Sequence, residues 1–298
     1  MSLRSQATRR PRLKIWLLTG AVVFTAAIAV SACGFVDTYR LEVKEYTCES
    51  PELPAEFDGT RIVLVTDIHR GASYSEERVG RLVDRVNALE PDLVLLGGDY
   101  VYGGTKYEAS CFAELARLQA PLGRFAVLGN HDYGDDDSDD PGPDGAIEAA
   151  SDAGIPLLRN QAVWLEKDGA RIRVGGVADY SEDRPKLAPI VADTDARDFV
   201  LLMSHNPDYA EDLPPGAVDL MLSGHTHGGQ VTLFGSWGIL VPSKYGQKYR
   251  TGIVTNEATT VIVSNGVGTS TLLPIRLFAP AQIVVITLRS GPTTSVYP

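Results

Sequence analysis

Two histidines placed two residues apart are the first feature of this sequence that indicates chemistry. His225 and His227 stand in the stretch Ser223-Gly-His-Thr-His-Gly-Gly-Gln230, which follows the apolar run 218–222. Residues two apart in an extended backbone point to the same side of the chain, and the flanking glycines let the backbone turn sharply. A pair of imidazoles suits a metal ion, whereas a polar turn after a strand is the alternative interpretation.

The other histidines repeat this placement. The chain has five histidines, and each lies just past a short apolar run that is typical of a buried strand. Ligands of α/β proteins bind at the carboxyl ends of strands, so we expect the side chains at five strand ends to meet at one rim and to bind metal. These side chains are Asp67, His69, Asp99, Asn130, His131, His205, His225 and His227.

The predicted ligands are carboxylates, imidazoles and one amide oxygen. Such a mixed oxygen and nitrogen set favours Mn, Fe or Zn over calcium or a thiolate-bound metal. Eight candidates are too many for one ion and suit two divalent metal ions, with Asp99 as the bridge. Two ions about 3.5–4 Å apart can hold a hydroxide and bind the oxygens of an in-line displacement. A phosphate ester is the substrate that fits this arrangement.

Three neighbouring residues are weaker candidates for substrate binding. Arg70 follows His69 and could pair with phosphate oxygens. Gly228 and Gly229 could offer backbone N–H groups to the substrate. A surface arginine, and glycines that only turn the chain, are the alternative interpretations.

Strands and helices alternate in the first half of the chain, which predicts the scaffold. A helix with Val79, Leu82, Val83, Val86 and Leu89 on its apolar face, capped by Ser73 with Glu76, separates the strands 61–65 and 92–96. Such a βαβ unit makes the two strands parallel. Strands dominate the second half, with a hairpin turn at Asp168-Gly169. We expect an α/β fold of two packed sheets flanked by helices, without a second domain.

The amino-terminal residues 1–32 are typical of an export signal or a membrane anchor. They contain five basic residues and no acidic residue, and 15–32 are uncharged. Thr8–Lys14 resembles a twin-arginine (Tat) signal peptide, and Val30-Ser-Ala-Cys33 resembles a lipobox with Cys33 as the lipidated residue. A retained membrane-spanning helix is the alternative. In both cases we expect a location on the extracytoplasmic face of the cell membrane, as a lipoprotein or through an N-terminal anchor.

Charge and composition bound the remaining possibilities. The chain has 298 residues, of which 44% are hydrophobic, so it can bury a large core. Its formal charge is −11 although the first 32 residues are basic, so the body repels nucleic-acid phosphates and no nucleic-acid partner is expected. We predict a lead-in strand and turn over 33–58 and one catalytic domain over 59–298. Cys48 and Cys111 either pair or are two unrelated small apolar residues.

The order of the motifs resembles the calcineurin-like metallophosphoesterase superfamily. Asp-x-His, Gly-Asp, Gly-Asn-His-Asp, His and Gly-His-x-His follow one another between Asp67 and Gln230. The stretches Ser-His-Asn-Pro-Asp and Gly-His-Thr-His-Gly-Gly-Gln resemble its membrane-associated YkuE/YaeI-type phosphodiesterase branch. The resemblance implies a four-layer sandwich of two mixed β-sheets flanked by helices.

The same resemblance implies a role for each ligand. His131 would be the catalytic residue that steadies the phosphate or protonates the leaving oxygen, and it would not bind metal. One ion would be held by Asp67, His69 and His227, the other by Asn130, His205 and His225, with Asp99 between them.

One segment departs from the family pattern. Protein phosphatases of the superfamily read Gly-Asp-x-Val-Asp-Arg-Gly, whereas this chain has Tyr102 in place of the second Asp and no arginine after it. That Asp orients the catalytic histidine, so Asp132 or a water is left to orient His131 here. The departure disfavours protein dephosphorylation and favours cleavage of phosphodiesters or pyrophosphates.

We therefore predict an exported, membrane-attached hydrolase that cleaves phosphodiester or phosphomonoester bonds by in-line attack of a metal-bridging hydroxide. Its expected partners are a phosphate-ester substrate, which could be lipid-linked, and the membrane. A pyrophosphatase acting on a lipid-linked nucleotide such as UDP-2,3-diacylglucosamine is the first alternative. A non-catalytic envelope protein that holds metal is the second, although such a protein has no need of His131.

Overall fold

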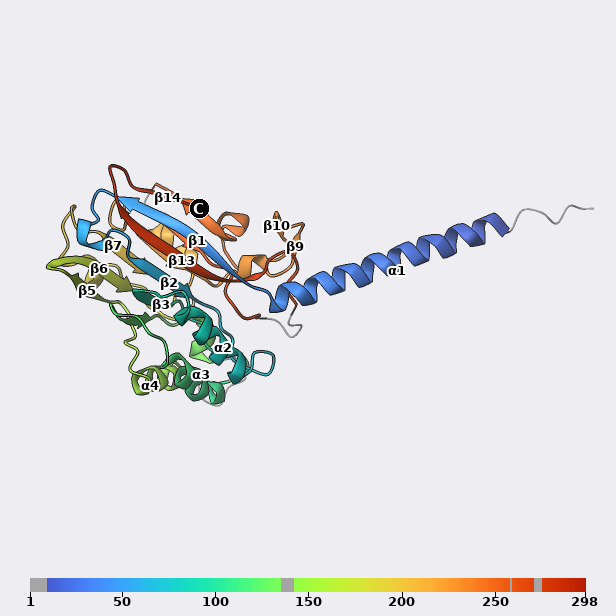
Figure 1. Ribbon diagram of the computed structural model, residues 1–298, viewed down its shortest axis with the longest axis horizontal. Helices are drawn as coiled ribbons and strands as arrows, with labels where there is room; N and C mark the ends of the chain where they lie inside the picture. The colour runs from blue at the N-terminus through green and yellow to red at the C-terminus, as the bar shows by residue number, and fades with distance from the viewer. Residues whose placement is uncertain (1–9, 135–141, 258, 271–274) are drawn as a thin grey trace, which may run out of the picture.

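Two β-sheets pack face to face, and helices cover their outer faces (Figure 1). The computed structural model describes residues 10–134, 142–257, 259–270 and 275–298; the rest, including part of the predicted export signal, lie outside the described residues. Both sheets mix parallel and antiparallel pairs. The predicted α/β fold, a four-layer sandwich of two mixed sheets flanked by helices, is confirmed.

The first sheet joins the two ends of the chain, in the strand order β14-β1-β13-β2-β3-β4. β1 runs parallel to β13, although more than two hundred residues separate them. β2, β3 and β4 are parallel, as the βαβ interpretation predicts. The strands are β1 (Leu41–Ser50), β2 (Arg61–Val65), β3 (Leu93–Leu96), β4 (Arg124–Ala126), β13 (Ala281–Ser290) and β14 (Ser295–Tyr297).

The second sheet has the strand order β11-β12-β8-β7-β6-β5, with β6, β7, β8 and β12 parallel. β5 and β6 form the predicted antiparallel hairpin around Asp168-Gly169. Its strands are β5 (Gln161–Lys167), β6 (Ala170–Gly176), β7 (Val200–Met203), β8 (Leu220–Ser223), β11 (Gly252–Thr255) and β12 (Thr260–Val263), and a separate two-stranded sheet holds β9 (Thr232–Leu233) and β10 (Trp237–Gly238).

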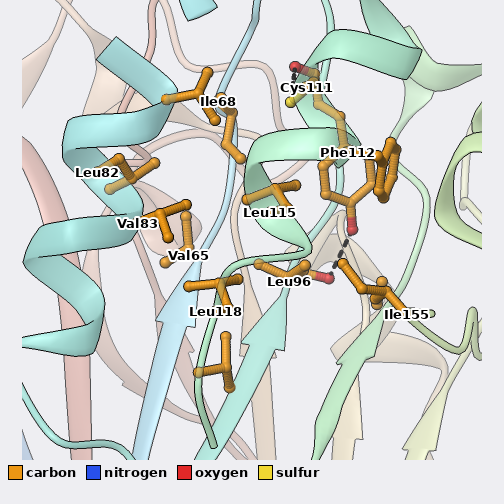
Figure 2. Close-up of a cluster of buried hydrophobic side chains, with 14 of the residues drawn as sticks. Val65, Ile68, Leu82, Val83, Leu96, Cys111, Phe112, Leu115, Leu118 and Ile155 are labelled. Carbon is orange, nitrogen blue, oxygen red and sulfur yellow. Dashed lines mark hydrogen bonds between the residues drawn. The ribbon is translucent and has the colours of Figure 1, made fainter. Parts of the chain in front are cut away.

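Alternation along the strands builds the cores on both sides of each sheet. In β2, Ile62 and Leu64 face the second sheet, whereas Val63 and Val65 face the outer helices. Figure 2 shows this outer cluster, in which Leu82 and Val83 of one helix and Phe112 and Leu115 of the next pack over the first sheet. The helices are α2 (Glu76–Asn87), α3 (Glu108–Leu115), α4 (Asp144–Asp152) and α5 (Ala188–Val191), with 3₁₀ turns η1 (Ala55–Phe57), η2 (Thr105–Tyr107), η3 (Asn130–Tyr133), η4 (Pro207–Asp212), η5 (His227–Gly229) and η6 (Gly246–Tyr249).

The structure tests two local predictions. Ser75, and not Ser73, caps α2, because its side chain accepts a hydrogen bond from Arg78 N as the helix begins later than predicted. Cys48 lies in the core between the sheets and Cys111 in the core under the helices, and both are free thiols. The interpretation as two unrelated apolar residues therefore holds.

A long helix, α1 (Arg10–Tyr39), projects from the body (Figure 1). Between Ile15 and Tyr39 it is long and apolar enough to cross a membrane. The helix runs without a break through Cys33, which is exposed. Its last turn is fixed to the body: Thr38 Oγ1 accepts a hydrogen bond from Arg276 N at 2.8 Å, and Asp37 Oδ2 accepts one from Phe278 N at 2.6 Å.

Candidate metal centre

The predicted metal ligands follow strands of both sheets. Asp67 and His69 follow β2, and Asp99 follows β3 in the first sheet. His205 follows β7, and the pair His225 and His227 follows β8 in the second sheet. Asn130 begins η3, just after β4. The rim expected from the sequence is thus the shared edge of two facing sheets.

The backbone turns sharply at the ligands themselves. Asp67, His69, Asp99, His225 and His227 all have positive φ angles, between 51° and 69°. Left-handed backbone is uncommon for residues other than glycine, and Asp and His are among the types that tolerate it best. Such conformations persist where the surrounding structure holds them, most often at functional sites. The turns let a side chain leave its strand end and point inward across the rim.

Four donors from the two sheets converge to form a first group. The ligand atoms of Asp67, His69, Asp99 and His227 all lie within 4.8 Å of one another, and all four residues are buried. His69 Nε2 lies 3.1 Å from His227 Nε2, although the two residues are 158 positions apart. His227 Nε2 is 3.4 Å from Asp67 Oδ1. Four donors at this separation suit one divalent ion.

A second group shares one residue with the first. The ligand atoms of Asp99, His205 and His225 also lie within 4.8 Å of one another. Asp99 Oδ2 is 3.4 Å from His69 Nε2 and 3.2 Å from His205 Nε2, so one carboxylate oxygen faces both groups. Asn130 Oδ1 is buried and has no hydrogen-bond partner among the described residues. This arrangement supports a dinuclear site around Asp99.

The hydrogen bonds around the donors show that the residues fit cations. His205 Nδ1 donates to Gly97 O at 2.8 Å, which leaves the Nε2 lone pair directed at Asp99 Oδ2. Two acceptors that face each other repel unless a cation or a proton lies between them. A histidine that binds metal ordinarily donates its other ring N–H to a carbonyl or a carboxylate, as His205 does.

Burial and neighbouring charge set the protonation of the site. Burial lowers the pKa of His69 and of His225 to about 3, so both rings are neutral near pH 7 and keep a lone pair for metal. Burial raises the pKa of Asp67 to about 6. Burial also opposes charge on His205, but the carboxylates of Asp99 and Asp67 outweigh it and raise the pKa of His205. The site therefore attracts positive charge.

Backbone N–H groups hold the two carboxylates in place. Asp67 Oδ1 accepts from His225 N at 3.0 Å, and Asp67 Oδ2 accepts from Thr66 Oγ1 at 2.8 Å. Asp99 Oδ1 accepts from His131 N at 2.9 Å, which leaves Oδ2 for the imidazoles. Each carboxylate is thus fixed by the protein and keeps its direction toward the donor groups.

Asp132 binds the backbone on both sides of the site. Its Oδ2 accepts from Asp99 N and Gly129 N, and its Oδ1 accepts from Tyr100 N, at 2.7–2.9 Å. A carboxylate engaged by three backbone N–H groups ties the Asp99 turn to the Gly129 turn. An orienting contact from Asp132 to the His131 ring stays a prediction.

Tyr102 occupies the space beside His131. Its ring centroid lies 5.2 Å from that of His131 and 5.5 Å from that of His69, with ring edges meeting faces. His131 also lies against His69, at 5.1 Å. The predicted catalytic residue thus borders the first donor group, and aromatic packing stands where protein phosphatases have a carboxylate.

The weaker substrate-binding candidates have internal partners. Arg70 donates to Gly71 O at 2.9 Å, and its guanidinium lies 4.7 Å from the centre of the Tyr107 ring. The backbone N–H of Gly229 donates to Thr226 O at 2.8 Å, and Gly228 and Gly229 both have positive φ. These contacts match the interpretation of the glycines as chain-turning residues, and a role of Arg70 in phosphate binding stays a prediction.

Arg276 is a residue of the site that sequence reasoning missed. Its guanidinium is fully buried and donates to the carbonyl oxygens of His227, Asn265 and Gly268 at 2.6–3.2 Å. It therefore joins the His227 turn to the turn that packs on Asp67. The one available signal is a single cation within the apolar stretch 274–278.

The chain is similar to several known proteins. The family model described as calcineurin-like phosphoesterase matches residues 60–229. The chain is 30% identical to the uncharacterized metallophosphoesterase YkuE of Bacillus subtilis (strain 168), across 92% of this chain and 96% of that protein. It is 27% identical to a transmembrane protein with metallophosphoesterase domain of Danio rerio, across 91% of this chain and 62% of that protein.

Among solved structures, TT1561 of Thermus thermophilus aligns with a TM-score of 0.46 at 11% identity, and the alignment covers 70% of this chain and 90% of that one. The family assignment itself depends on the sequence match, which spans more than half of the chain and contains every residue of the two donor groups. This chain belongs to the calcineurin-like phosphoesterase family and is a metal-dependent phosphoesterase.

Proposed function

We propose that this protein is a membrane-attached phosphodiesterase of the outer face of the cell membrane that uses two ions of Mn, Fe or Zn. The single observation that carries the proposal is the placement of Asp99 Oδ2 between the two donor groups. When bound, two divalent ions would supply an activated water and neutralise charge on the phosphate. The mixed carboxylate and imidazole set matches these metals.

The residues of the chain would then have separate roles in metal binding and catalysis. One ion would be held by Asp67, His69 and His227, the other by Asn130, His205 and His225, with Asp99 shared. The two carboxylates are fixed by backbone N–H groups and so hold their direction. The ring of His131 borders the first group and would protonate the leaving oxygen or steady the phosphate.

Tyr102 supports a diester as the substrate. A carboxylate beside His131 would hold the imidazole in its charged form, whereas the Tyr102 ring packs against it without adding charge. The dianion of a phosphomonoester benefits most from a charged imidazole, whereas a diester carries a single negative charge and depends less on it. Phosphoproteins are accordingly poor candidates.

Attachment to the membrane is proposed through the segment that contains Cys33. The helix α1 has the length and composition of a membrane span, and the relative from Danio rerio is named as a transmembrane protein. Acylation of Cys33 after removal of residues 1–32 would place the lipid shortly before the body begins at β1. The intact mass of the protein purified from membranes distinguishes a lipidated chain from one that retains the helix.

The test of the enzyme is hydrolysis of bis(p-nitrophenyl) phosphate by the full-length protein with Mn²⁺, Fe²⁺ or Zn²⁺, together with elemental analysis. We expect two ions per chain and turnover. Asp99→Asn should lower the rate at least about 100-fold, because the shared ligand is lost. Asp219→Asn is the matched control: Asp219 is a half-buried carboxylate that accepts a hydrogen bond from Val200 N on the second sheet.

Folded protein that binds metal but turns over no substrate with any of the three metals would contradict the proposal. A non-catalytic metal-holding protein would behave in this way, with identical rates for the wild type and Asp99→Asn.

A further inference from the structure

Apolar side chains that no part of the described fold covers gather on the β9–β10 hairpin. Phe234 is 87% exposed and Leu240 is 76% exposed, and Leu233, Trp237 and Ile239 are each more than half exposed. Phe278 from a distant part of the chain joins them, with its ring 5.8 Å from that of Phe234. We call this set of six residues the hairpin patch. An exposed apolar patch of this kind marks a contact surface.

The backbone of the patch is as unusual as its exposure. Phe234 and Phe278 have φ angles of 52° and 53°, in the left-handed region that bulky residues rarely adopt. Phe234 is the first residue of the three-residue loop between Leu233 and Trp237, a position where Gly or Asn relieves the strain. Phe234 thus combines a strained backbone with a side chain that is almost fully exposed, and such strain is most often found at functional positions.

The hairpin patch is continuous with the end of α1. A Cβ atom on Gly34 would lie 2.9 Å from Ile275, and Asp37 accepts the backbone N–H of Phe278. Thr232 N donates to Leu277 O at 3.0 Å, so the segment 275–278 joins the helix to the hairpin. Figure 1 shows β9 and β10 at the end of the body from which α1 projects. Whatever surface α1 enters therefore also faces the patch.

The hairpin segment has no acidic residue of its own. The chain carries −11 overall, yet the 31 residues from Thr226 to Asn256 contain three basic residues and no acidic residue. Lys244, Lys248 and Arg250 follow the hairpin in this segment. Lys248 pairs with Glu211, and the Arg250 guanidinium donates to the carbonyl oxygens of Gly228 and Gly235. The hairpin segment therefore adds no negative charge of its own that an anionic lipid surface would repel.

The patch is also joined to the metal centre. Leu277 N donates to Gln230 O at 2.9 Å, and Gln230 stands three residues after His227. The guanidinium of Arg276 donates to His227 O, and its backbone N–H donates to Thr38 at the end of α1. A surface that holds the hairpin therefore lies a short distance from the rim where substrate must bind.

We propose that the hairpin patch inserts into the interface of a phospholipid bilayer, and that the metal centre consequently acts on phosphate esters presented at the membrane surface. The occupant is a lipid bilayer and not a second copy of the chain, because the patch is continuous with the end of α1, which is long and apolar enough to cross a membrane. The inference rests on the proposed membrane attachment and adds a second contact to it.

Fluorescence quenching tests the contact in the full chain. The protein is reconstituted in vesicles of phosphatidylcholine and phosphatidylglycerol with bromine on the acyl chains, and Trp16 and Trp164 are replaced by Phe so that Trp237 alone emits. We expect strong quenching of Trp237. The matched control keeps only Trp164, which lies on β5 and packs against Arg171, and it should not be quenched.

Flotation of the same vesicles separates the two possible failures. Protein that floats while Trp237 stays unquenched would overturn the hairpin proposal but leave membrane attachment intact. Protein that does not float would overturn the attachment and the hairpin proposal together. A dimer that buries Trp237 in the absence of lipid would show that a second copy covers the patch, which also refutes the proposal.

A pair of substrates tests the consequence for catalysis. Hexadecyl p-nitrophenyl phosphate embedded in vesicles and soluble bis(p-nitrophenyl) phosphate react alike: water attacks phosphorus, the P–O bond to p-nitrophenolate breaks and a monoester remains. The double variant Phe234→Asp/Leu240→Asp should lose about tenfold or more on the embedded diester and nothing on the soluble one. Tyr297→Asp, an exposed aromatic on β14, is the matched control with no loss on either. Equal rates of the double variant and the wild type on the embedded diester would refute the proposal.

Discussion

The smallest change that should abolish the metal centre is Gly129→Ala. Gly129 has a φ of −105°, which any residue adopts, so alanine adds no backbone strain. Its Cβ atom would lie 2.3 Å from Asp99 Oδ1, 2.6 Å from Asp99 N and 2.8 Å from His205 Cε1. Ordinary van der Waals contact begins at 3.4 Å, so Asp99 and the new methyl group must separate by about 1 Å.

The hydrogen bonds around Asp99 and Gly129 make this separation disruptive. Asp132 Oδ2 accepts hydrogen bonds from both Gly129 N and Asp99 N, so the two turns cannot move apart without breaking one of them. Ligands of a metal site must stay within about 0.2 Å of their distances. A misplacement of about 1 Å at a catalytic site costs on the order of 100-fold in rate.

The expected outcome is folded protein with fewer than two ions per chain and a rate at least about 100-fold lower, measured by elemental analysis, circular dichroism and diester hydrolysis. Overpacking costs about 1–3 kcal/mol, which is less than the total stability of about 5–15 kcal/mol. Gly175→Ala is the control, because its Cβ atom would meet Ile190 at 2.4 Å, away from the site. Full metal content and full rate in Gly129→Ala would refute the geometry given for Asp99.

Three further outcomes are expected. Acid should weaken metal binding, because Asp67 has a raised pKa of about 6 without metal and its proton must leave before an ion binds. The metal affinity measured by chelator competition should fall about tenfold per pH unit below 6. A constant affinity from pH 7 to 5 would be inconsistent with Asp67 as a ligand. Chelation should lower Tm by about 5 °C or more in a thermal scan, since bound ions stabilise only the folded chain, and no shift would argue against occupied sites. Tyr102→Phe should keep kcat within about twofold, whereas Tyr102→Ala should lower kcat up to about tenfold, because the ring and not the hydroxyl packs on His131. An equal loss of kcat in both variants would show that the hydroxyl has a role.

The sequence alone was sufficient to predict the main strands and the residue types at their ends. Short apolar runs followed by glycine, aspartate and histidine predict buried strands whose ends carry ligands, and those strands are present at β2, β3, β7 and β8. The hairpin of β5 and β6 follows from its Asp-Gly turn in the same way. These features are local, because strand propensity and turn chemistry depend on neighbouring residues.

Local sequence patterns could not predict contacts between residues that are distant in the sequence. Nothing local says that β1 pairs with β13, or that Arg276 places its guanidinium under His227. The capping of α2 by Ser75 in place of Ser73 shows that a local capping motif alone does not fix where a helix begins.

The exposed residues near Phe234 also show what the sequence does not reveal. Their apolar sequence does not reveal that they are exposed, which the structure shows beside the end of α1.

The sequence by itself thus determined which carboxylates and imidazoles stand at strand ends, and hence that divalent metal and phosphate chemistry is available. The expected meeting of these ends at one rim did not say which sheet each belongs to. Only the tertiary structure decided that the ends come from two different sheets that face each other, and that His69 Nε2 and His227 Nε2 lie 3.1 Å apart across 158 residues. The physical reason is that a strand specifies its own direction and buried face, whereas the packing of one sheet on another depends on the combined apolar faces of both.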